Sequence, residues 1–266
     1  MNDYLQLSHW QVALAALLIV VNAVTSIAWK LGLERTLAVA SVRTIVQLTL
    51  VGFVLQWVFR PEQPWYVVLC LATVMTLAAG ISAAGQVGRS YRRMLVDSIL
   101  SVWTSSWLVT AYVLLVVLQR GADWYQPQYL APLLGMVLGN ALNGISLGLG
   151  TFTESLITRR GEVEALLTLG ATRWEAAHRP IRDAVRTGMV PIVNAMMVVG
   201  IVSLPGMMTG QLLSGTSPVD AVKYQVVVMF MIAAATALGT TAAVMLSYRR
   251  LFNVDQQFVV EALSAG

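Results

Sequence analysis

The stretch WQVALAALLIVVNAVTSIAW, from Trp10 to Trp29, carries no charged residue over twenty positions. A helix needs about 20 mainly apolar residues to cross the hydrocarbon core of a bilayer, so this stretch alone predicts a membrane-spanning helix. It is too long for the apolar part of a typical cleaved signal peptide, and its leader holds Asp3 but no lysine or arginine. We therefore expect it to stay in the protein as the first span.

The whole chain of 266 residues shares this character, because 57% of its residues are hydrophobic and only 11% are charged. An ordinary soluble domain has about 25% charged residues, which it needs to cover its surface. This composition excludes a soluble enzyme, a disordered protein and a nucleic-acid-binding module. The single cysteine, Cys70, excludes an intrachain disulfide framework and a cysteine-rich metal cluster. We expect a multi-pass protein of the cell (inner) membrane.

Seven segments are long and apolar enough to be spans. The expected fold class is all-α, a polytopic membrane protein that forms one transmembrane domain over residues 1–266. The spans are expected at about 10–29, 37–59, 65–84, 94–118, 130–150, 188–209 and 218–246.

The distribution of lysine and arginine predicts the orientation of the spans, because cytoplasmic loops carry an excess of both. The loops after spans 1, 3 and 5 and the C-terminal tail hold most of the basic residues, whereas the other side has Arg60, Arg120 and, at the border, Lys223. The N-terminus is therefore expected outside and the C-terminus in the cytoplasm.

One segment between spans, residues 151–187, reads as structure rather than as a simple loop. Thr151 and Glu154 have the spacing of a capping box, which predicts a helix that starts there and ends at Gly170. Thr172 and Glu175 repeat the pattern and predict a second helix toward span 6. Pro180 should kink or interrupt this second helix.

The turn of this segment is apolar, and two interpretations stay open. It is either a solvated connector between spans or a docking site, because an apolar stretch in water needs a partner. Importers of the ABC class present such a turn to their ATPase as Glu-Ala-Ala, three residues, then Gly. Here Glu164-Ala165-Leu166 is followed by three residues and Gly170, with Leu in the third position.

Five further segments carry a resemblance to a known family. They are GMVLGNA (135–141), LTLGAT (167–172), RDAVR (182–186), VSLPGMMTG (202–210) and SPVDAVKYQ (217–225). Together with LERT (33–36), Arg43 and Gln47, they resemble the FetB/YbbM-like ABC transporter permease family, which is linked to iron export and related to plant aluminium-tolerance permeases. The likeness covers roughly residues 30 to 250.

The resemblance implies a transporter subunit that is not itself an enzyme. The chain has no Gly-x4-Gly-Lys-Ser/Thr loop, and its only lysines are Lys30 and Lys223, so the nucleotide chemistry must reside on another polypeptide. Membership implies a homodimer of this chain with two copies of a P-loop ATPase, which would hold ATP and Mg, and no cofactor in this chain. The implied cargo is a metal ion, iron first. The expected ATPase-coupling residues are Glu164, Ala165, Leu169, Gly170, Ala171, Thr172, Arg173 and Trp174.

Polar groups within spans are candidates for the translocation path, because they are costly in a bilayer unless they have partners or a function. Arg43 and Asp97 have opposite charges in the same leaflet, so an ion pair and a cargo or gating role both stay open. Met196, Met197, Met229 and Met231 add soft thioethers, which suit Cu(I) better than iron and also pack adaptably. Pro205 can interrupt span 6, and no metal ligand set is identified. The path candidates are Arg43, Gln47, Asp97, Asn140, Asn143, Asn194, Pro205, Met207 and Met208.

Two other functional classes stay open as alternatives. An ion-coupled secondary transporter usually shows inverted repeats, and no internal repeat is visible here. A seven-helix receptor is disfavoured by the capped, apolar segment at 151–187. Co-purification with a P-loop ATPase would separate the ABC permease from both.

Overall fold

The structure is a computed structural model, and it describes residues 8–60, 64–119, 124–253, 257–259 and 263–265. Arg120, one of the residues on which the predicted orientation rests, lies outside this part. The chain divides into two compact units, Met1–Gln63 and Pro64–Gly266, which are described separately. A single domain over the whole chain stays a prediction.

The first unit is an antiparallel pair of helices, α1 (His9–Ala28) and α2 (Glu34–Val58). The turn between them is held by Ser26, whose hydroxyl donates to the Glu34 carboxylate at 3.0 Å and accepts from the Leu33 amide at 2.9 Å. Gly32 has a φ of +69° in this turn, a conformation that glycine adopts without strain. Both helices match the first two predicted spans to within about three residues at each end.

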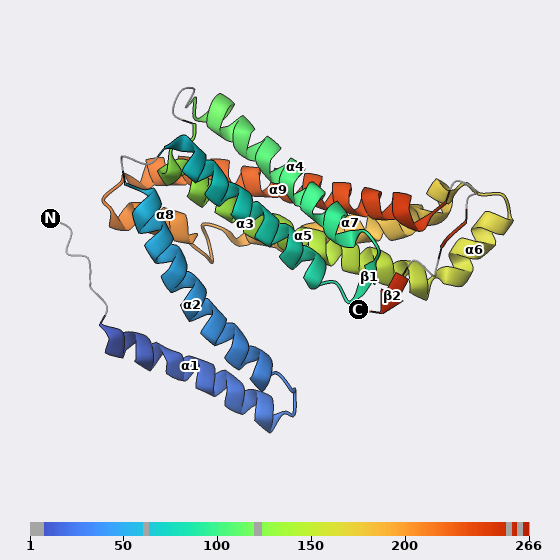
Figure 1. Cartoon of the computed structure of the whole chain (residues 1–266), viewed down its shortest axis with the longest axis horizontal. Helices are drawn as coiled ribbons and strands as arrows, with labels where there is room; N and C mark the ends of the chain where they lie inside the picture. Colours follow the sequence, from blue (N-terminus) through green and yellow to red (C-terminus); the bar gives the residue numbers. More distant parts are fainter. Residues whose placement is uncertain (1–7, 61–63, 120–123, 254–256, 260–262, 266) are drawn as a thin grey trace. The chain divides into compact units, whose positions relative to one another are not determined.

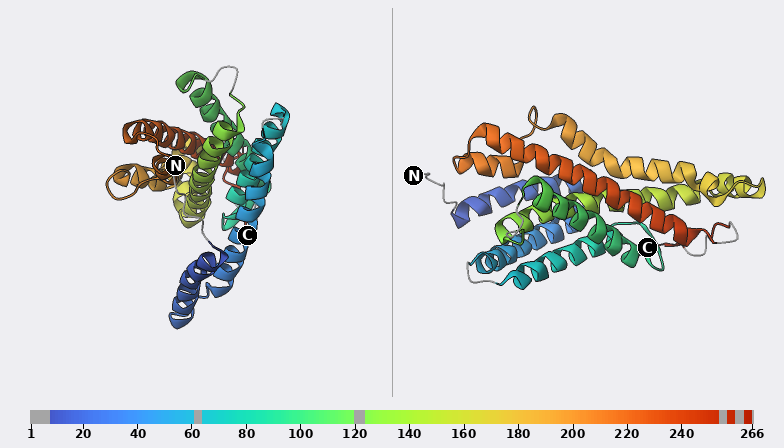
Figure 2. Two further views of the ribbon diagram at one scale, coloured as in Figure 1. Left: turned by 90° about the vertical axis from the view of Figure 1, so that its left-hand side faces the viewer. Right: turned by 90° about the horizontal axis from the view of Figure 1, so that it is seen from above.

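The second unit is a helical bundle with α5 (Pro127–Thr158) in its middle. Around α5 pack α3 (Trp65–Gly85), α4 (Met94–Tyr112), α7 (Arg173–Val198) and α9 (Pro218–Leu251). The right-hand view of Figure 2 shows α7 and α9 side by side. A π-helical segment, η1 (Val113–Val117), extends α4 over the rest of the fourth predicted span.

Three short elements complete this unit. Helix α6 (Arg160–Thr168) lies between α5 and α7, and α8 (Gly206–Leu213) lies between α7 and α9. Strand β1 (Arg89–Tyr91) follows α3 and pairs antiparallel with β2 (Leu263–Ala265), with Ser90 opposite Ser264. The pairing ties the connection between α3 and α4 to the C-terminal part of the chain.

Six helices of the described residues are long and apolar enough to cross a membrane, not seven. The predicted sixth span, 188–209, is not one helix, because α7 ends at Val198 and α8 begins at Gly206. Gly200 lies in the break with a φ of +84°, and Pro205 directly precedes α8, as the expected interruption at Pro205 requires. Six of the first fourteen residues of α7 are charged, so the helix as a whole is too polar to be counted as a span. The polytopic all-α fold class is confirmed, whereas the orientation stays a prediction.

The helix that the Thr151–Glu154 pattern predicts does not begin at Thr151, so this prediction is wrong. The predicted membrane boundary of span 5 at Gly150 stays a prediction. α5 continues without a break to Thr158, so Thr151 and Glu154 lie inside a helix and form no capping box at its start. Phe152 and Leu156 are completely buried on this extension. Their burial explains the continuation, since packing of an apolar face contributes more to helix stability than local propensity does.

Candidate functional site: the 151–187 hairpin and the polar groups of the bundle

The segment that the sequence singles out forms a helical hairpin, here called the 151–187 hairpin. It consists of the last turns of α5, the helix α6, a turn at Gly170 and the first half of α7. Figure 1 shows α6, in yellow, at one end of the second unit, beyond the packed part of the bundle. At 1.5 Å per residue, the 32 residues of α5 span roughly 48 Å. This exceeds the hydrocarbon thickness of about 30 Å, so a spanning α5 projects from the membrane.

The turn is a well-formed helix C-terminus. The amide of Ala171 donates to the Leu166 carbonyl at 3.0 Å, and the amide of Gly170 donates to the Leu167 carbonyl at 3.1 Å. These two bonds define a Schellman motif, in which the residue at the position of Gly170 is left-handed. Its φ is +93°, so the predicted glycine break is confirmed.

The second arm starts with the capping box that the sequence predicts. The Glu175 amide donates to the Thr172 hydroxyl at 3.3 Å, and the Thr172 amide donates to the Glu175 carboxylate at 2.7 Å. The backbone amide and then the hydroxyl of Thr172 lower the pKa of Glu175, because both donate to its charged form. Helix α7 continues through Pro180, so Pro180 does not interrupt it, and the kink that was expected as the alternative stays a prediction.

Exposed ion pairs connect the two arms. The Arg159 guanidinium lies 3.4 Å from the Asp183 carboxylate, and that of Arg179 lies 3.5 Å from the carboxylate of Glu162. Within α6, Arg160 pairs with Glu164 at 2.7 Å. Exposed pairs of this kind contribute little to stability individually. They orient α6 against α7 and occupy the Glu164 side chain, one of the expected coupling residues.

The apolar side chains of the turn differ in their surroundings. Leu169 is 84% exposed. Trp174 is 43% exposed, and its ring contacts His178 and Tyr248 with centroid distances of 5.6 and 5.9 Å. Arg173 lies over the same Tyr248 ring and donates to the Asn253 carbonyl at 3.2 Å. Trp174 and Arg173 therefore attach the hairpin to α9, whereas Leu169 is available to a partner.

Glycines allow α5 to pack very closely against α7 and α9 next to the hairpin. A Cβ atom on Gly188 would lie 2.5 Å from the Gly144 carbonyl oxygen, and a Cβ on Gly148 would lie 2.6 Å from a methyl group of Thr240. Gly144 and Gly148 therefore pack α5 against α7 and α9 within one chain. By contrast, a Cβ on Gly139 would meet no atom within 4 Å. Gly144 and Gly148, whose GxxxG spacing is typical of close helix packing in membranes, thus serve packing within one chain.

Asp97 has a partner that the sequence did not identify. Its carboxylate accepts a hydrogen bond from the Tyr91 hydroxyl at 3.0 Å and lies 3.6 Å from the Arg250 guanidinium. The Asp97 side chain is 2% exposed, whereas that of Arg250 is 41% exposed. Burial, and next the negative charge of Asp97, raise the pKa of the Tyr91 hydroxyl. These three residues are called the Asp97 cluster below.

Arg43 and Gln47 lie on α2 of the first unit with exposed side chains. The pairing of Arg43 with Asp97 stays a prediction, and Asp97 has a counter-ion without it. Arg250 is one of the basic residues of the C-terminal tail that the sequence places on the same side as Asp97. It lies in the last turn of α9, which continues beyond the predicted end of span 7 at residue 246, and no signal in the sequence paired it with Asp97.

The three asparagines lie on exposed faces of α5 and α7, not between helices of this chain. Asn140 donates to the Met136 carbonyl of its own helix at 2.8 Å. Asn143 is one turn further along α5, and Asn194 lies on the apolar half of α7. The hydrogen bond of the Asn140 amide group is therefore formed within its own helix.

The methionines that the sequence offers as soft ligands lie on α7, α8 and α9. Among the described residues, no group of three or more His, Cys, Asp or Glu side chains could hold a metal ion. Met207 and Met208 are half-buried on α8, directly after Pro205. Met208 joins Met196 and Met229 around a cavity that is described below.

The chain is similar to proteins of one family over nearly its whole length. The profile described as "Uncharacterised protein family (UPF0014)" matches residues 9–252. A UPF0014 membrane protein of Synechocystis is 40% identical, covering 90% of this chain and 92% of its own length. The "Probable iron export permease protein FetB" of Escherichia coli is 32% identical over 99% of both chains. "Protein ALUMINUM SENSITIVE 3" of Arabidopsis thaliana is 29% identical, covering 94% of this chain and 90% of its own. No solved structure matches this chain significantly.

Proposed function

The chain belongs to the UPF0014 family of membrane proteins, and from this premise we propose that it is the permease subunit of an ABC transporter that exports a metal ion, most specifically iron. The carrying observation is the 151–187 hairpin, a rigid extension of two bundle helices that ends in an exposed leucine. The cargo and the direction are supported by the name of the Escherichia coli relative, which is similar over 99% of both chains.

The hairpin has the mechanical properties of a coupling element. Its turn is fixed by a Schellman motif and a capping box, and its arms are the continuous ends of α5 and α7. Displacement of the turn by a partner would therefore be transmitted along both helices. It would reach the contact of Gly144 with Gly188, where the two backbones touch. A flexible tether would not transmit such a displacement.

The proposed assembly is a homodimer of this chain in the cell (inner) membrane, with one P-loop ATPase docked under each copy. ATP and Mg are held by the ATPase, and this chain holds no cofactor of its own. The side chain that we propose enters the ATPase is Leu169, because interface energy concentrates in a few large side chains that become buried on binding. Trp174 instead holds the hairpin against α9 in this proposal, since its ring already contacts Tyr248.

The exposed asparagines support the dimer. Asn140 and Asn143 on α5 and Asn194 on the apolar half of α7 are exposed, and lipid would offer no hydrogen-bond partner to the amide groups that helix carbonyls do not already satisfy. We propose that these faces meet the second copy and line the path of the cargo. Amide and carbonyl oxygens are ligands that a metal ion tolerates in transit, since weak binding permits release.

The test is co-expression with a P-loop ATPase from the same source, followed by purification of the complex and reconstitution into proteoliposomes. Leu169→Asp should abolish co-purification and vanadate-sensitive Fe²⁺ transport, while membrane insertion and thermal stability stay unchanged because Leu169 is 84% exposed. Thr158→Asp is the matched control, since it adds the same charge at an exposed site eleven residues away. The proposal would be contradicted if the ATPase does not co-purify with the wild-type chain, or if it co-purifies normally with Leu169→Asp.

A further inference from the structure

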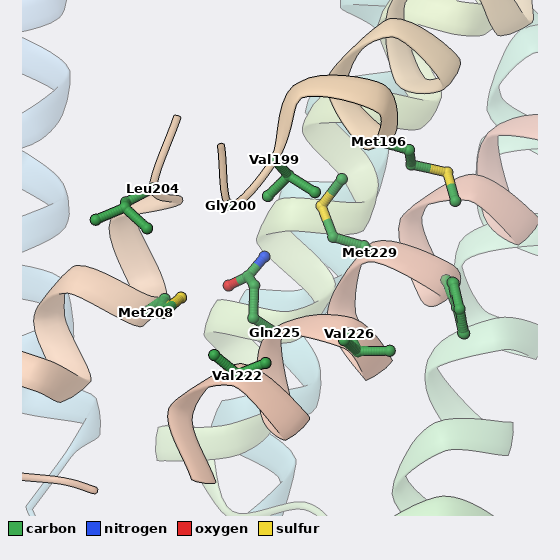
Figure 3. A pocket seen from close by; sticks show the side chains of 10 residues that line it. Met196, Val199, Gly200, Leu204, Met208, Val222, Gln225, Val226 and Met229 are labelled. Carbon is green, nitrogen blue, oxygen red and sulfur yellow. The ribbon is translucent and has the colours of Figure 1, made fainter. Parts of the chain in front are cut away.

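A cavity of about 310 Å³ lies where the predicted sixth span breaks, between the end of α7, the start of α8 and the first turns of α9. Figure 3 shows its lining. The left-handed backbone at Gly200 turns the chain away from the axis of α7. The residues that line it are Met196, Val199, Gly200, Leu204, Met208, Val222, Gln225, Val226, Met229 and Phe230.

The lining is apolar apart from one side chain. It contains no charged residue, and its apolar groups include three methionines, which adapt to ligands of different shape. Small-molecule sites have volumes of about 300–1,000 Å³, mostly hydrophobic walls and a few polar groups that orient the ligand. The cavity has these properties.

Gln225 is the polar group. The residue is 6% exposed, and its side-chain oxygen Oε1 accepts no hydrogen bond from the residues that the structure describes. Figure 3 shows its amide pointing into the space between Met208 and Met229. A buried polar group without a partner costs about 1–3 kcal/mol. This cost is relieved when a bound molecule donates a hydrogen bond to the oxygen.

We propose that this cavity binds a small, uncharged, mostly apolar organic molecule with one hydrogen-bond donor, which donates to Gln225 Oε1. The space is many times what a single ion or water molecule needs. A hard cation would find no carboxylate in the lining. A soft cation would need the thioethers to converge, but the Met196 sulfur is turned away from Gln225 (Figure 3). The site does not depend on the proposed ATPase partner.

The test uses two probes that differ by one hydroxyl group, 4-fluorophenol and fluorobenzene. Their binding to the purified full-length protein is followed by fluorine NMR at a fixed detergent concentration, so that partition into detergent is equal for all variants. Wild type should bind 4-fluorophenol more tightly than fluorobenzene. Gln225→Met should weaken 4-fluorophenol binding about fivefold, the equivalent of one hydrogen bond of roughly 1 kcal/mol. Fluorobenzene binding should not weaken.

Filling the cavity gives a second, independent variant. Val226→Trp should abolish saturable binding of both probes, whereas Val219→Trp should not, since Val219 lies on the same helix outside the lining and is 64% exposed. If Gln225→Met does not fold, the comparison of the two probes on wild type and on the two tryptophan variants still tests whether the cavity binds the ligand.

Two outcomes would overturn the proposal. The first is that both probes bind equally to wild type and to Val226→Trp, which would show that the signal reports only partition of the probes into detergent. The second is saturable stabilisation by Ag⁺ that the Met208→Leu, Met229→Leu double variant loses, without discrimination between the two organic probes. That result would identify a soft-cation site instead.

Discussion

The 151–187 hairpin and the Asp97 cluster both carry charge at an end of the same helical bundle, but they are built in opposite ways. The hairpin holds its shape with local backbone motifs and exposed ion pairs, and it leaves Leu169 uncovered. The Asp97 cluster buries a carboxylate and matches it with Tyr91 and Arg250, from segments far apart in the sequence. The first arrangement suits a surface that binds and releases a partner. The second suits a fixed joint between α4 and α9.

The largest effect is expected at the fixed joint. Arg250→Met should lower the free energy of unfolding by about 2–4 kcal/mol, because it leaves the buried Asp97 carboxylate without its counter-ion. Thermal unfolding in detergent measures the change. Lys223→Met, which removes an exposed ion pair with Asp220, is the control and should have almost no effect.

The difference in burial between Asp97 and Arg250 allows a second test of this ion pair. Asp97→Asn alone should cost less than Arg250→Met, because Arg250 is partly exposed and its charge can be hydrated. Adding Asp97→Asn to Arg250→Met should restore part of the loss. If Arg250→Met unfolds at the temperature of Lys223→Met, the joint does not depend on this ion pair.

The next effect concerns the turn of the hairpin. Gly170→Val should destabilise the turn by about 1–2 kcal/mol, because a β-branched residue is strained at a φ of +93°. A Cβ there would meet no atom within 4 Å, so the loss comes from the backbone alone. Hydrogen exchange of α6 should rise, and coupling of ATP hydrolysis to transport should fall.

Gly161→Ala is the matched control for this turn. Gly161 also has open space around its Cα, but it lies inside α6 without a positive φ. Alanine should stabilise the helix there by up to about 1 kcal/mol. Equal responses at the two glycines would show that the left-handed turn does not matter.

Loss of the helix cap should have a smaller effect. Thr172→Ala should cost about 1 kcal/mol, the usual value for an N-cap, and hydrogen exchange should rise at the start of α7. The folded-state pKa of Glu175 is lowered, so its contribution is present above the unfolded pKa and is lost as the pH falls through the folded value. The protection factors of wild type, which correct for the intrinsic pH dependence of amide exchange, should therefore fall on acidification, and Glu175→Gln should remove this pH dependence. A wild-type profile that is flat with pH would contradict the assigned cap.

The smallest effect is expected for the ion pairs between the arms. Arg179→Ala should change stability by less than about 0.5 kcal/mol, because both Arg179 and Glu162 are exposed. The difference from wild type should vanish at high salt, where exposed charges are screened. A loss that matches that of Arg250→Met would remove the distinction between the two regions.

Local pattern sufficed for much of this protein. Long runs of mainly apolar residues located six of the helices, because a bilayer leaves a chain few ways to satisfy its backbone. The Thr172–Glu175 box and the Gly170 turn were also predictable from the sequence, because each is a set of hydrogen bonds among residues a few positions apart.

Tertiary packing decided the rest. The Thr151–Glu154 pattern was overridden because Phe152 and Leu156 gain burial only if α5 continues. The counter-ion of Asp97 could not be predicted from local sequence either, because the path of α9 brings Arg250 to α4. The break in the sixth span was signalled by Pro205, but the cavity around Gln225 required α8 to fold back against α9. Contacts between distant segments depend on where each helix begins and ends, and a shift of a few residues rotates every side chain to another face.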